Sequence, residues 1–454
     1  MTKKRQIALA ESSTTNRAKK MVKPQPLTFD EIVSIIQSGD SQKLKEIIES
    51  GKVKDINMTS NGHETLLMVA CQSGFVECAR VLLDNQANIN YIANFVGSVL
   101  RSACLSGNMD IVKFLIDRGV VINDQLIFCL LREREIMCNT EITTNLIGYI
   151  QNVNYVYEHQ SMLYQACYSG EVNVVMMLLV RGARFDDHRC DPLVGACSLG
   201  HLEIVKLLLS WSTNNGRISD ERVEDALEIA SRFGFIEVVR CLIEYGTDAR
   251  ALNSALYEAV DCHQVEMAAF LLDNGADFND SSTQCSSWIY ACRYGSVDMV
   301  RLFLDRGADP NTVDERGKSP LRAALKDPQL LSILLERGAD PNTHFADGST
   351  ALLQLIQRMQ GEYMRALTVL LEHGANPNLT YAATGQTPLM IAALMLRVDL
   401  VQLLLEHGAD VTQVDRDGQS VLDMLGKTRK YRELRELCTQ YIECNKPGAK
   451  LLLK

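Results

Sequence analysis

The chain has 454 residues, of which 46% are hydrophobic and 22% charged, and its formal net charge is −10. The charge is uneven, because residues 1–25 carry +6 and residues 427–454 carry +5, which leaves −21 on residues 26–426. A body this acidic argues against a protein that wraps a nucleic-acid backbone, which needs a basic face.

The first 27 residues are rich in Ser, Thr and Lys and contain Pro24 and Pro26, so we expect a disordered basic tail. They lack the apolar stretch of a signal peptide, and no run of 18 apolar residues elsewhere would span a membrane. The basic clusters at residues 3–5 and 19–20 fit either a nuclear signal or a solvated tail, and we favour the tail. We therefore expect an intracellular protein, cytoplasmic rather than nuclear.

The first folded element is expected at Thr28, where Thr28 and Glu31 have the spacing of a helix capping box. The helix that follows it, around Leu44 and Ile47, has many charged positions. Such a polar pair of helices suits the N-terminal end of a stack, whose outer face meets water.

From residue 61 onward the chain repeats one plan. In its clearest copy a short apolar helix from Trp288 ends at Tyr294–Gly295, and a second helix ends at Arg306–Gly307, where glycine favours a left-handed C-cap. An extended finger, Asp309–Asn311, follows. Neither helix is long enough to bury its own apolar stripe, so each copy needs a stacked neighbour. The alanine of this copy, Ala291, has counterparts at Ala70, Ala103, Ala166, Ala196, Ala230, Ala259, Ala324 and Ala392.

The local motifs resemble the ankyrin repeat, a unit of about 33 residues with a T-P-L-H-x-A signature. Residues 387–392 read TPLMIA and residues 319–324 read SPLRAA, while GADPN occurs at 307–311 and again at 338–342. The resemblance implies an all-α solenoid of about 12–13 stacked helix–turn–helix repeats with β-turn fingers, over residues 28–445. It indicates function only weakly, because one fold hosts many functions.

Several repeats depart from the plan. Residues 124–157 lack the alanine and glycine landmarks, but their length fits one degenerate repeat with helices at Leu126–Arg134 and Thr143–Gln151. Residues 210–216 form a polar, turn-prone insertion. In the tenth repeat Pro328 takes the glycine position and should shorten the first helix.

The C-terminal repeat, residues 415–445, has a charged stretch at 427–433 in place of an apolar second helix. A charged outer face is what the C-terminal cap of a stack requires. We expect residues 446–454 to be a flexible tail.

The cysteines are placed like small buried side chains, since five of them directly follow the aligned alanine. Successive repeats would hold them about 10 Å apart, too far for disulfides. Free thiols also favour a reducing compartment. The five are Cys71, Cys104, Cys167, Cys197 and Cys292.

The sequence contains none of the common catalytic or nucleotide-binding motifs. The densest polar cluster, residues 186–191, combines carboxylates, an imidazole and a thiol, but it falls on a finger, where Asp ordinarily makes turns. We therefore expect no enzyme activity, no catalytic or cofactor-binding residues, no cofactor and no metal.

The ankyrin resemblance implies that first helices and fingers line a concave groove, the family's usual recognition surface. The two residues before the glycine position should face it, and aromatic and Arg side chains there are the types that dominate interface energetics. The same side chains could instead cover neighbouring repeats, with only intramolecular cation–π contacts. The groove candidates are Tyr168, Arg232, Phe233, Arg293 and Tyr294.

Finger tips offer a second set of candidates, because exposed aromatic and charged side chains on loops of a rigid scaffold often bind. The resemblance also implies that finger asparagines could be hydroxylated, with Asn90 and Asn279 most similar to such acceptors, although both could simply hold the finger turn. The finger-tip candidates are Tyr91, Phe95, His188, Arg189, Arg316, Phe345 and Tyr381.

We predict a monomeric, non-catalytic scaffold or adaptor that binds a protein, either a peptide or a folded domain, and neither nucleic acid nor membrane. One alternative is a targeting subunit of an enzyme complex, such as a ubiquitin-ligase or phosphatase adaptor, for which residues 433–444 are the available docking helix. Another is an enzyme with an unmarked site in residues 124–157.

Overall fold

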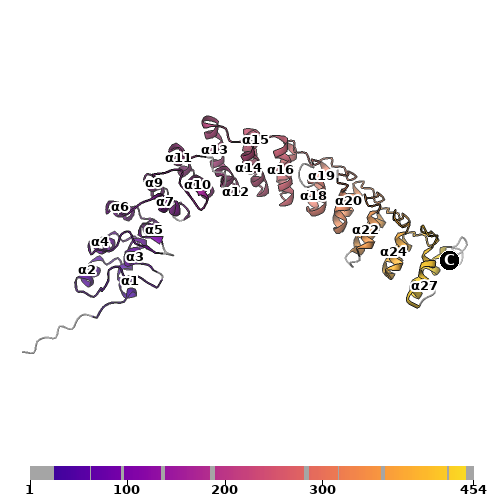
Figure 1. Ribbon diagram of the computed structural model, residues 1–454, viewed down its shortest axis with the longest axis horizontal. Coiled ribbons are helices and arrows are strands. Elements are labelled where there is room, and N and C mark those ends of the chain that lie inside the picture. The colour runs from indigo at the N-terminus through magenta and orange to yellow at the C-terminus, as the bar shows by residue number, and fades with distance from the viewer. Residues whose placement is uncertain are drawn as a thin grey trace, which may run out of the picture. The chain divides into compact units, whose positions relative to one another are not determined.

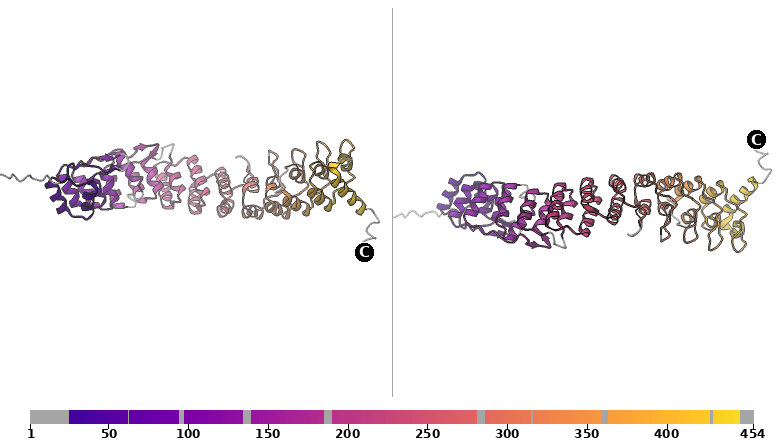
Figure 2. Two further views of the ribbon diagram at one scale, coloured as in Figure 1. Left: turned by 90° about the horizontal axis from the view of Figure 1, so that it is seen from below. Right: turned by 90° about the horizontal axis from the view of Figure 1, so that it is seen from above.

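The structure is a computed structural model that describes residues 25–61, 63–93, 97–133, 139–184, 190–280, 286–314, 316–358, 363–426 and 429–445. Its contacts divide the chain into two compact units, residues 1–190 and 191–454. Most of both tails expected from the sequence lies outside the described residues. In both units short helices follow one another in pairs (Figures 1 and 2).

Among its described residues, unit 1 contains five helix pairs and two short antiparallel hairpins at finger tips. In the hairpins β1 (Ile92–Ala93) pairs with β2 (Gly97–Ser98), and β3 (Val156–Tyr157) pairs with β4 (Gln160–Ser161). The helix pairs are α1 (Phe29–Gln37) with α2 (Ser41–Glu49), α3 (Leu66–Gln72) with α4 (Val76–Asp84), α5 (Val99–Leu105) with α6 (Met109–Asp117), α7 (Asp124–Leu131) with α9 (Thr140–Ile147), and α10 (Met162–Ser169) with α11 (Val172–Val180).

In the part of unit 2 that the structure describes, eight pairs follow the same plan. They are α12 (Pro192–Ser198) with α13 (Leu202–Asn215), α14 (Asp220–Arg232) with α15 (Ile236–Gly246), α16 (Ala249–Asp261) with α17 (Val265–Asp273), α18 (Ser287–Tyr294) with α19 (Val297–Asp305), α20 (Pro320–Ala323) and η1 (Ala324–Lys326) with α21 (Pro328–Glu336), α22 (Ala351–Gln357) with α23 (Met364–Glu372), α24 (Pro388–Leu394) with α25 (Val398–Glu406), and α26 (Val421–Leu425) with η3 (Arg429–Tyr431) and α27 (Arg432–Asn445). The pairs confirm the all-α repeat architecture.

Local sequence explains where each helix starts and stops. Ser286 caps α18 by accepting a hydrogen bond from the Ile289 N–H at 3.3 Å, and Ser296 caps α19 in the same way. After α19, Gly307 has φ +88°, a left-handed conformation that only glycine adopts at little cost. The expected capping box between Thr28 and Glu31 is also present.

The core lies between the two helices of each pair and between neighbouring pairs. Within unit 2, α14 contacts α12 and α16, and α16 contacts α18, while α17, α19 and α21 contact in succession. Ala230, Ala259 and Ala291 have no exposed surface, because neighbouring first helices pack closely against them. No repeat could bury these residues alone, so the stack itself is the core.

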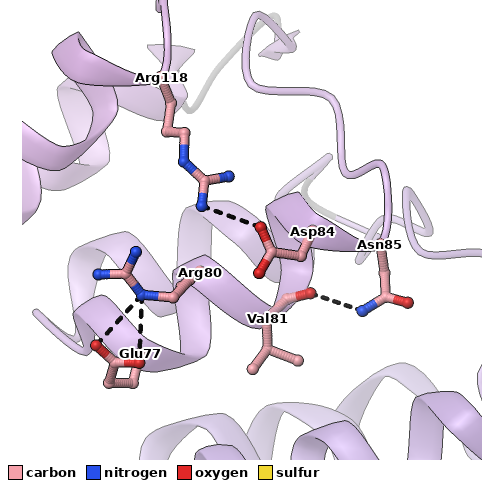
Figure 3. A network of polar contacts seen from close by, with 6 residues as sticks. All are labelled: Glu77, Arg80, Val81, Asp84, Asn85 and Arg118. Carbon is pink, nitrogen blue, oxygen red and sulfur yellow. Dashed lines mark hydrogen bonds and ion pairs between the residues drawn. The ribbon is translucent and has the colours of Figure 1, made fainter.

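Arginines at the ends of second helices tie neighbouring repeats together. The Arg118 guanidinium lies 3.0 Å from Asp84 of the preceding repeat, and both Arg80 and Arg118 lie over the Phe114 ring (Figure 3 shows the polar contacts). Equivalent ion pairs join Arg306 to Asp273 at 2.6 Å and Arg337 to Asp305 at 2.8 Å. Because these pairs are partly exposed, each contributes about 0–1 kcal/mol.

Three departures from the regular plan can be compared with the structure. Helices α7 and α9 occupy residues 124–157, each beginning a few residues earlier than expected. Pro328 does shorten its first helix, since α20 spans four residues before η1, and Pro328 begins α21. The expected turn at residues 210–216 is wrong, because α13 continues as helix to Asn215.

Candidate protein-binding site

The exposed ends of the first helices in unit 2 carry large aromatic side chains. Phe233, the C-cap residue of α14, is 51% exposed, and Tyr294, the last residue of α18, is 52% exposed. The aligned alanines of the same helices are buried, so the chain turns away from the core within three residues. Two of the groove candidates therefore lie where a partner could reach them.

Arg232 is engaged within the stack. Its guanidinium lies 2.7 Å from the Glu258 carboxylate of α16, and the hydrogen bond to Glu258 raises the pKa of Arg232. Phe233 lies beside Phe235 with ring centroids 6.2 Å apart. The Arg232 side chain therefore contacts a neighbouring repeat, as the alternative interpretation predicts. The Phe233 side chain remains half exposed.

Tyrosine rings form a row across α16 and α18. The Tyr290 ring lies 4.7 Å from Tyr257 and 4.9 Å from Tyr294. The Tyr290 hydroxyl donates a hydrogen bond to Asp261, which raises the pKa of Tyr290. The exposed Arg293 guanidinium lies 4.9 Å from the Tyr294 ring centroid, a cation–π arrangement. The row fixes the orientation of Tyr294 before any partner arrives.

Tyr168 is the groove candidate in unit 1. It is 43% exposed on α10 and stacks on Tyr164, with centroids 6.1 Å apart and the rings 21° from parallel. The structure therefore places Tyr168 on its own unit's surface, and unit 1 and unit 2 each present an aromatic patch.

The finger-tip candidates do not form one exposed set. Phe95, His188 and Arg189 lie outside the described residues. Tyr91 is half-buried and packs against the core of unit 1.

In unit 2, Arg316 is exposed and Tyr381 is half-buried in a turn closed by the Gly385 N–H to Tyr381 carbonyl hydrogen bond, at 2.8 Å. The expected exposure of Phe345 is wrong, because it is only 6% exposed. Its ring is covered by the Arg322 guanidinium 5.2 Å away, and its backbone closes a tight hairpin with Ser349. Whether any of these side chains binds a partner stays a prediction.

The two finger asparagines, Asn90 and Asn279, take part in hydrogen bonds within the protein. The Asn90 Oδ1 accepts a hydrogen bond from the Val121 N–H of the next finger at 2.8 Å. The backbone N–H of Asn279 donates to Asp277 at 2.8 Å, and its side chain has no hydrogen-bond partner among the described residues. Both residues are exposed. Hydroxylation of either one stays a prediction.

Six cations that sequence reasoning did not bring together line one hollow of about 400 Å³ in unit 2. We call it the basic hollow. The cations come from the end of α18, from the next finger, from α20 and η1, and from the end of α22. The sequence feature that could have indicated this cluster is the recurrence of Arg or Lys at the ends of successive first helices. They are Arg293, Arg316, Lys318, Arg322, Lys326 and Arg358.

An apolar hollow of about 420 Å³ lies on unit 1, between the fingers of the second and third repeats. It is lined by Ile92, which is 74% exposed, and by Val121, which is 59% exposed. Leu126 of α7 forms part of its floor.

Two buried thiols and the arrangement of possible metal ligands can be examined for chemistry. Burial raises the pKa of Cys71 and of Cys104 to about 12, so both thiols stay protonated and unreactive at neutral pH. In the described ranges no three His, Cys, Asp or Glu side chains lie close enough to hold a metal ion. Of the polar cluster at 186–191, Asp191 caps α12 and lies 3.2 Å from Arg222, while residues 186–189 lie outside the description.

Comparison with known proteins identifies the repeat. Models described as "Ankyrin repeats (3 copies)" match residues 32–125, 136–219, 213–282 and 322–415, and one described as "Ankyrin repeats (many copies)" matches residues 282–324. The chain belongs to the ankyrin-repeat family. Ankyrin repeats are protein-interaction modules and are generally non-catalytic.

Curated relatives share only part of their length with this ankyrin-repeat protein. The ankyrin repeat and KH domain-containing protein mask-1 of Caenorhabditis elegans is 27% identical over 32% of this chain and 6% of its own length. A transient receptor potential cation channel subfamily A member 1 homolog of the same species is 28% identical over 35% of this chain and 14% of its own. The chain thus spans a small fraction of these relatives.

A viral relative and a solved structure are each similar to part of this chain. The putative ankyrin repeat protein FPV014 of fowlpox virus is 27% identical over 32% of this chain and 35% of its own length. The crystal structure of the Bcl-3 ankyrin repeat domain is 27% identical, covers 47% of this chain and 97% of its own, and has a TM-score of 0.42. Within the described ranges of this ankyrin-repeat protein, every helix is too short or too polar to cross a membrane.

Proposed function

We propose that this chain is a non-catalytic scaffold or adaptor whose partner, a peptide or a folded domain, binds along the exposed first-helix ends and fingers of unit 2. The observation that carries the proposal is the pair Phe233 and Tyr294, two half-exposed aromatic residues at matching positions of the repeat. Aromatic side chains that are held in place before binding lose little conformational entropy when a partner covers them. The ring contacts of Tyr294 supply that order.

The proposal includes a monomer that acts inside the cell, in the cytoplasm, and that uses neither a membrane nor nucleic acid. Cysteine usage supports the compartment, since no disulfide joins the eleven described cysteines and a reducing environment keeps thiols reduced. The strongly acidic body supports the exclusion of nucleic acid.

The alternative, a targeting subunit that docks through residues 433–444, has less support. Those residues belong to α27, which packs on α25 and α26 and buries Leu434 and Cys438. A helix whose apolar side is already covered offers mainly charged groups for docking. Its removal would also expose the end of the stack, so binding through α27 cannot be separated from stability by truncation.

The test is affinity purification of the full-length chain from cells of its natural source, with quantitative mass spectrometry. The variant is Arg232→Ala, Phe233→Ala and Tyr294→Ala combined, and the control is Arg301→Ala with Arg365→Ala on α19 and α23. We expect the variant to lower recovery of the specific partner at least about tenfold, because buried aromatic anchors each contribute 1 kcal/mol or more. The control should leave recovery unchanged.

Loss of Arg232 also leaves Glu258 unpaired, so a second variant with only Phe233→Ala and Tyr294→Ala separates binding from stability. Melting temperatures of all variants provide the reference. If the partner's yield stays the same in both variants while they remain folded, the proposed surface is wrong.

A further inference from the structure

The basic hollow gathers positive charge from three neighbouring repeats of unit 2. Six cations line it, and among the described residues no carboxylate shares the lining. Arg293, Lys326 and Arg358 are exposed and make no ion pair with a described residue. This concentration of positive charge occurs in a chain whose residues 26–426 carry a formal charge of −21.

Two described carboxylates near the hollow keep their charge but accept hydrogen bonds from the backbone. Asp314 accepts hydrogen bonds from the backbone N–H groups of Arg316 and Lys318 at 2.9 and 2.7 Å, which shapes the finger. Asp327 caps α21 by accepting from the Gln329 N–H at 2.9 Å. These bonds hold both carboxylates against the backbone.

Asp347 pairs with one of the lining cations. It lies 2.9 Å from Arg322 and also accepts hydrogen bonds from Ser349 and Gln354. Arg322 in addition covers the Phe345 ring. Arg322 therefore belongs to the wall of the hollow, whereas Arg293, Lys326 and Arg358 make no ion pair with a described residue.

Helix geometry explains how the fold tolerates these charges side by side. Arg293 lies in the last turn of α18, Lys326 in η1 and Arg358 at the C-cap of α22. The carbonyl ends of helices carry partial negative charge, which favours cations. The helix ends stabilise each exposed cation by only a few tenths of a kcal/mol to about 1 kcal/mol. The cations can therefore lie close together and still bind an anion.

We propose that the basic hollow binds an acidic segment of a partner polypeptide, with Asp or Glu carboxylates meeting Arg293, Lys326 and Arg358. This inference rests on the proposed function and names the chemistry of the partner at one part of that surface. Charge complementarity selects the occupant, and the exposed Tyr294 ring beside Arg293 gives an apolar residue of the same segment a place to pack. A long polyanion such as nucleic acid would extend beyond the hollow over the acidic body, where it would be repelled.

The test measures fluorescence anisotropy of a short fluorescein-labelled peptide of alternating Asp and Ser with the full-length protein. A Lys–Ser peptide of the same length and a single-stranded oligonucleotide with the same number of charges serve as comparisons. Lys326→Glu with Arg358→Glu reverses two charges in the hollow. Arg301→Glu with Arg365→Glu makes the same change of net charge on α19 and α23, where both arginines are exposed.

We expect the Asp–Ser peptide to bind the natural protein more tightly than either comparison. The hollow variant should weaken it about tenfold or more, the control variant by less than about twofold, and added salt should weaken it steeply. The neutral pair Lys326→Gln with Arg358→Gln should give an intermediate loss, and melting temperatures show that each variant is folded.

Three results would overturn the inference: no binding of the acidic peptide, equal losses in the hollow and control variants, or tighter binding of the oligonucleotide. Equal losses would place the peptide on the basic tails or on the general surface. If the hollow and control variants lose equally but the Phe233→Ala and Tyr294→Ala variant still loses its partner, the proposed scaffold function is kept. Only the binding of an acidic segment in the basic hollow is then wrong. If the basic hollow binds the acidic peptide as expected but partner recovery does not depend on Phe233 and Tyr294, the inference about the hollow is kept. The binding surface proposed at Phe233 and Tyr294 is then wrong.

Discussion

Single asparagines connect the fingers of unit 2 to one another. The Asn342 Oδ1 accepts from the Asn376 N–H at 2.7 Å, and its Nδ2 donates to the Gly374 carbonyl at 3.2 Å. Asn311 and Asn378 make the same two bonds to the following repeat. A short amide offers both a donor and an acceptor, which Asp cannot do. The GADPN motif is therefore a link between repeats as well as a turn.

We predict that Asn342→Ala lowers the free energy of unfolding of unit 2 by about 1 kcal/mol, since two partly exposed hydrogen bonds are lost. Urea denaturation followed by circular dichroism measures the change. Asn279→Ala is the matched control, because the Asn279 side chain makes no such bond among the described residues, and its effect should be smaller. Equal effects would mean that the asparagines act only within their own turns.

The sequence predicted some of these residue roles and not others. Burial of the five first-helix cysteines followed from their position after the aligned alanine and is confirmed. The basic hollow was missed because its cations come from residues 293, 316–326 and 358, and only the stacking of three repeats brings them together. Burial of Phe345 was missed for the same reason, since the cover is Arg322 from the preceding repeat.

Among the elements, α13 shows most clearly what local sequence leaves out. Ser210, Ser212 and Thr213 disfavour helix in isolation, yet here their hydroxyls donate to carbonyls three residues earlier, at 2.7 to 2.9 Å. The Tyr245 hydroxyl of α15 bonds to Ser212 at 2.9 Å and accepts from the Ile218 N–H at 3.1 Å. Tyr245, which is 33 positions from Ser212, thus stabilises the C-terminal part of α13. A local sequence pattern could not reveal this contact. The shortening of α20 needed only Pro328 itself, and it was predicted.

We predict that Tyr245→Phe destabilises the C-terminal part of α13 by about 1–2 kcal/mol, because it leaves the buried Ser212 hydroxyl and the Ile218 N–H each short of a partner. Hydrogen exchange should accelerate over residues 210–218 and remain unchanged elsewhere in unit 2. Tyr294→Phe removes a hydroxyl with no hydrogen bond to a described residue and should not alter exchange there. Unchanged exchange in Tyr245→Phe would show that α13 is extended by its own side chains alone.

At the scale of the whole molecule, both units bury alanine and cysteine on their first helices, beside larger apolar side chains. Cys71 and Cys104 lie on α3 and α5, which pack together, while Cys197 and Cys292 lie on α12 and α18. Small side chains let neighbouring helices approach closely. The cysteine thiols are then buried where water could not solvate a thiolate charge. The whole stack therefore shares one sensitivity to alkaline pH.

Burial raises the pKa of Cys71 and Cys104 to about 12 in the folded chain, whereas an exposed thiol titrates near 9.0. Between about pH 9 and about pH 12 the unfolded chain therefore binds fewer protons than the folded one, and the free energy of unfolding falls as pH rises. Below pH 9 these thiols make no pH-dependent contribution. Tyrosines and lysines titrate in the same range, so the effect must be read as a difference between proteins.

We predict that a variant with Cys71→Ala and Cys104→Ala loses stability less steeply than the natural protein between pH 9 and pH 11. Urea midpoints across this range, measured in a reducing buffer, give the two slopes. Met176→Ala, which removes an exposed sulfur that does not titrate, should keep the natural slope. Parallel curves for the cysteine variant and the natural protein would mean that water reaches these thiols, and that the first helices are packed less tightly than their burial indicates.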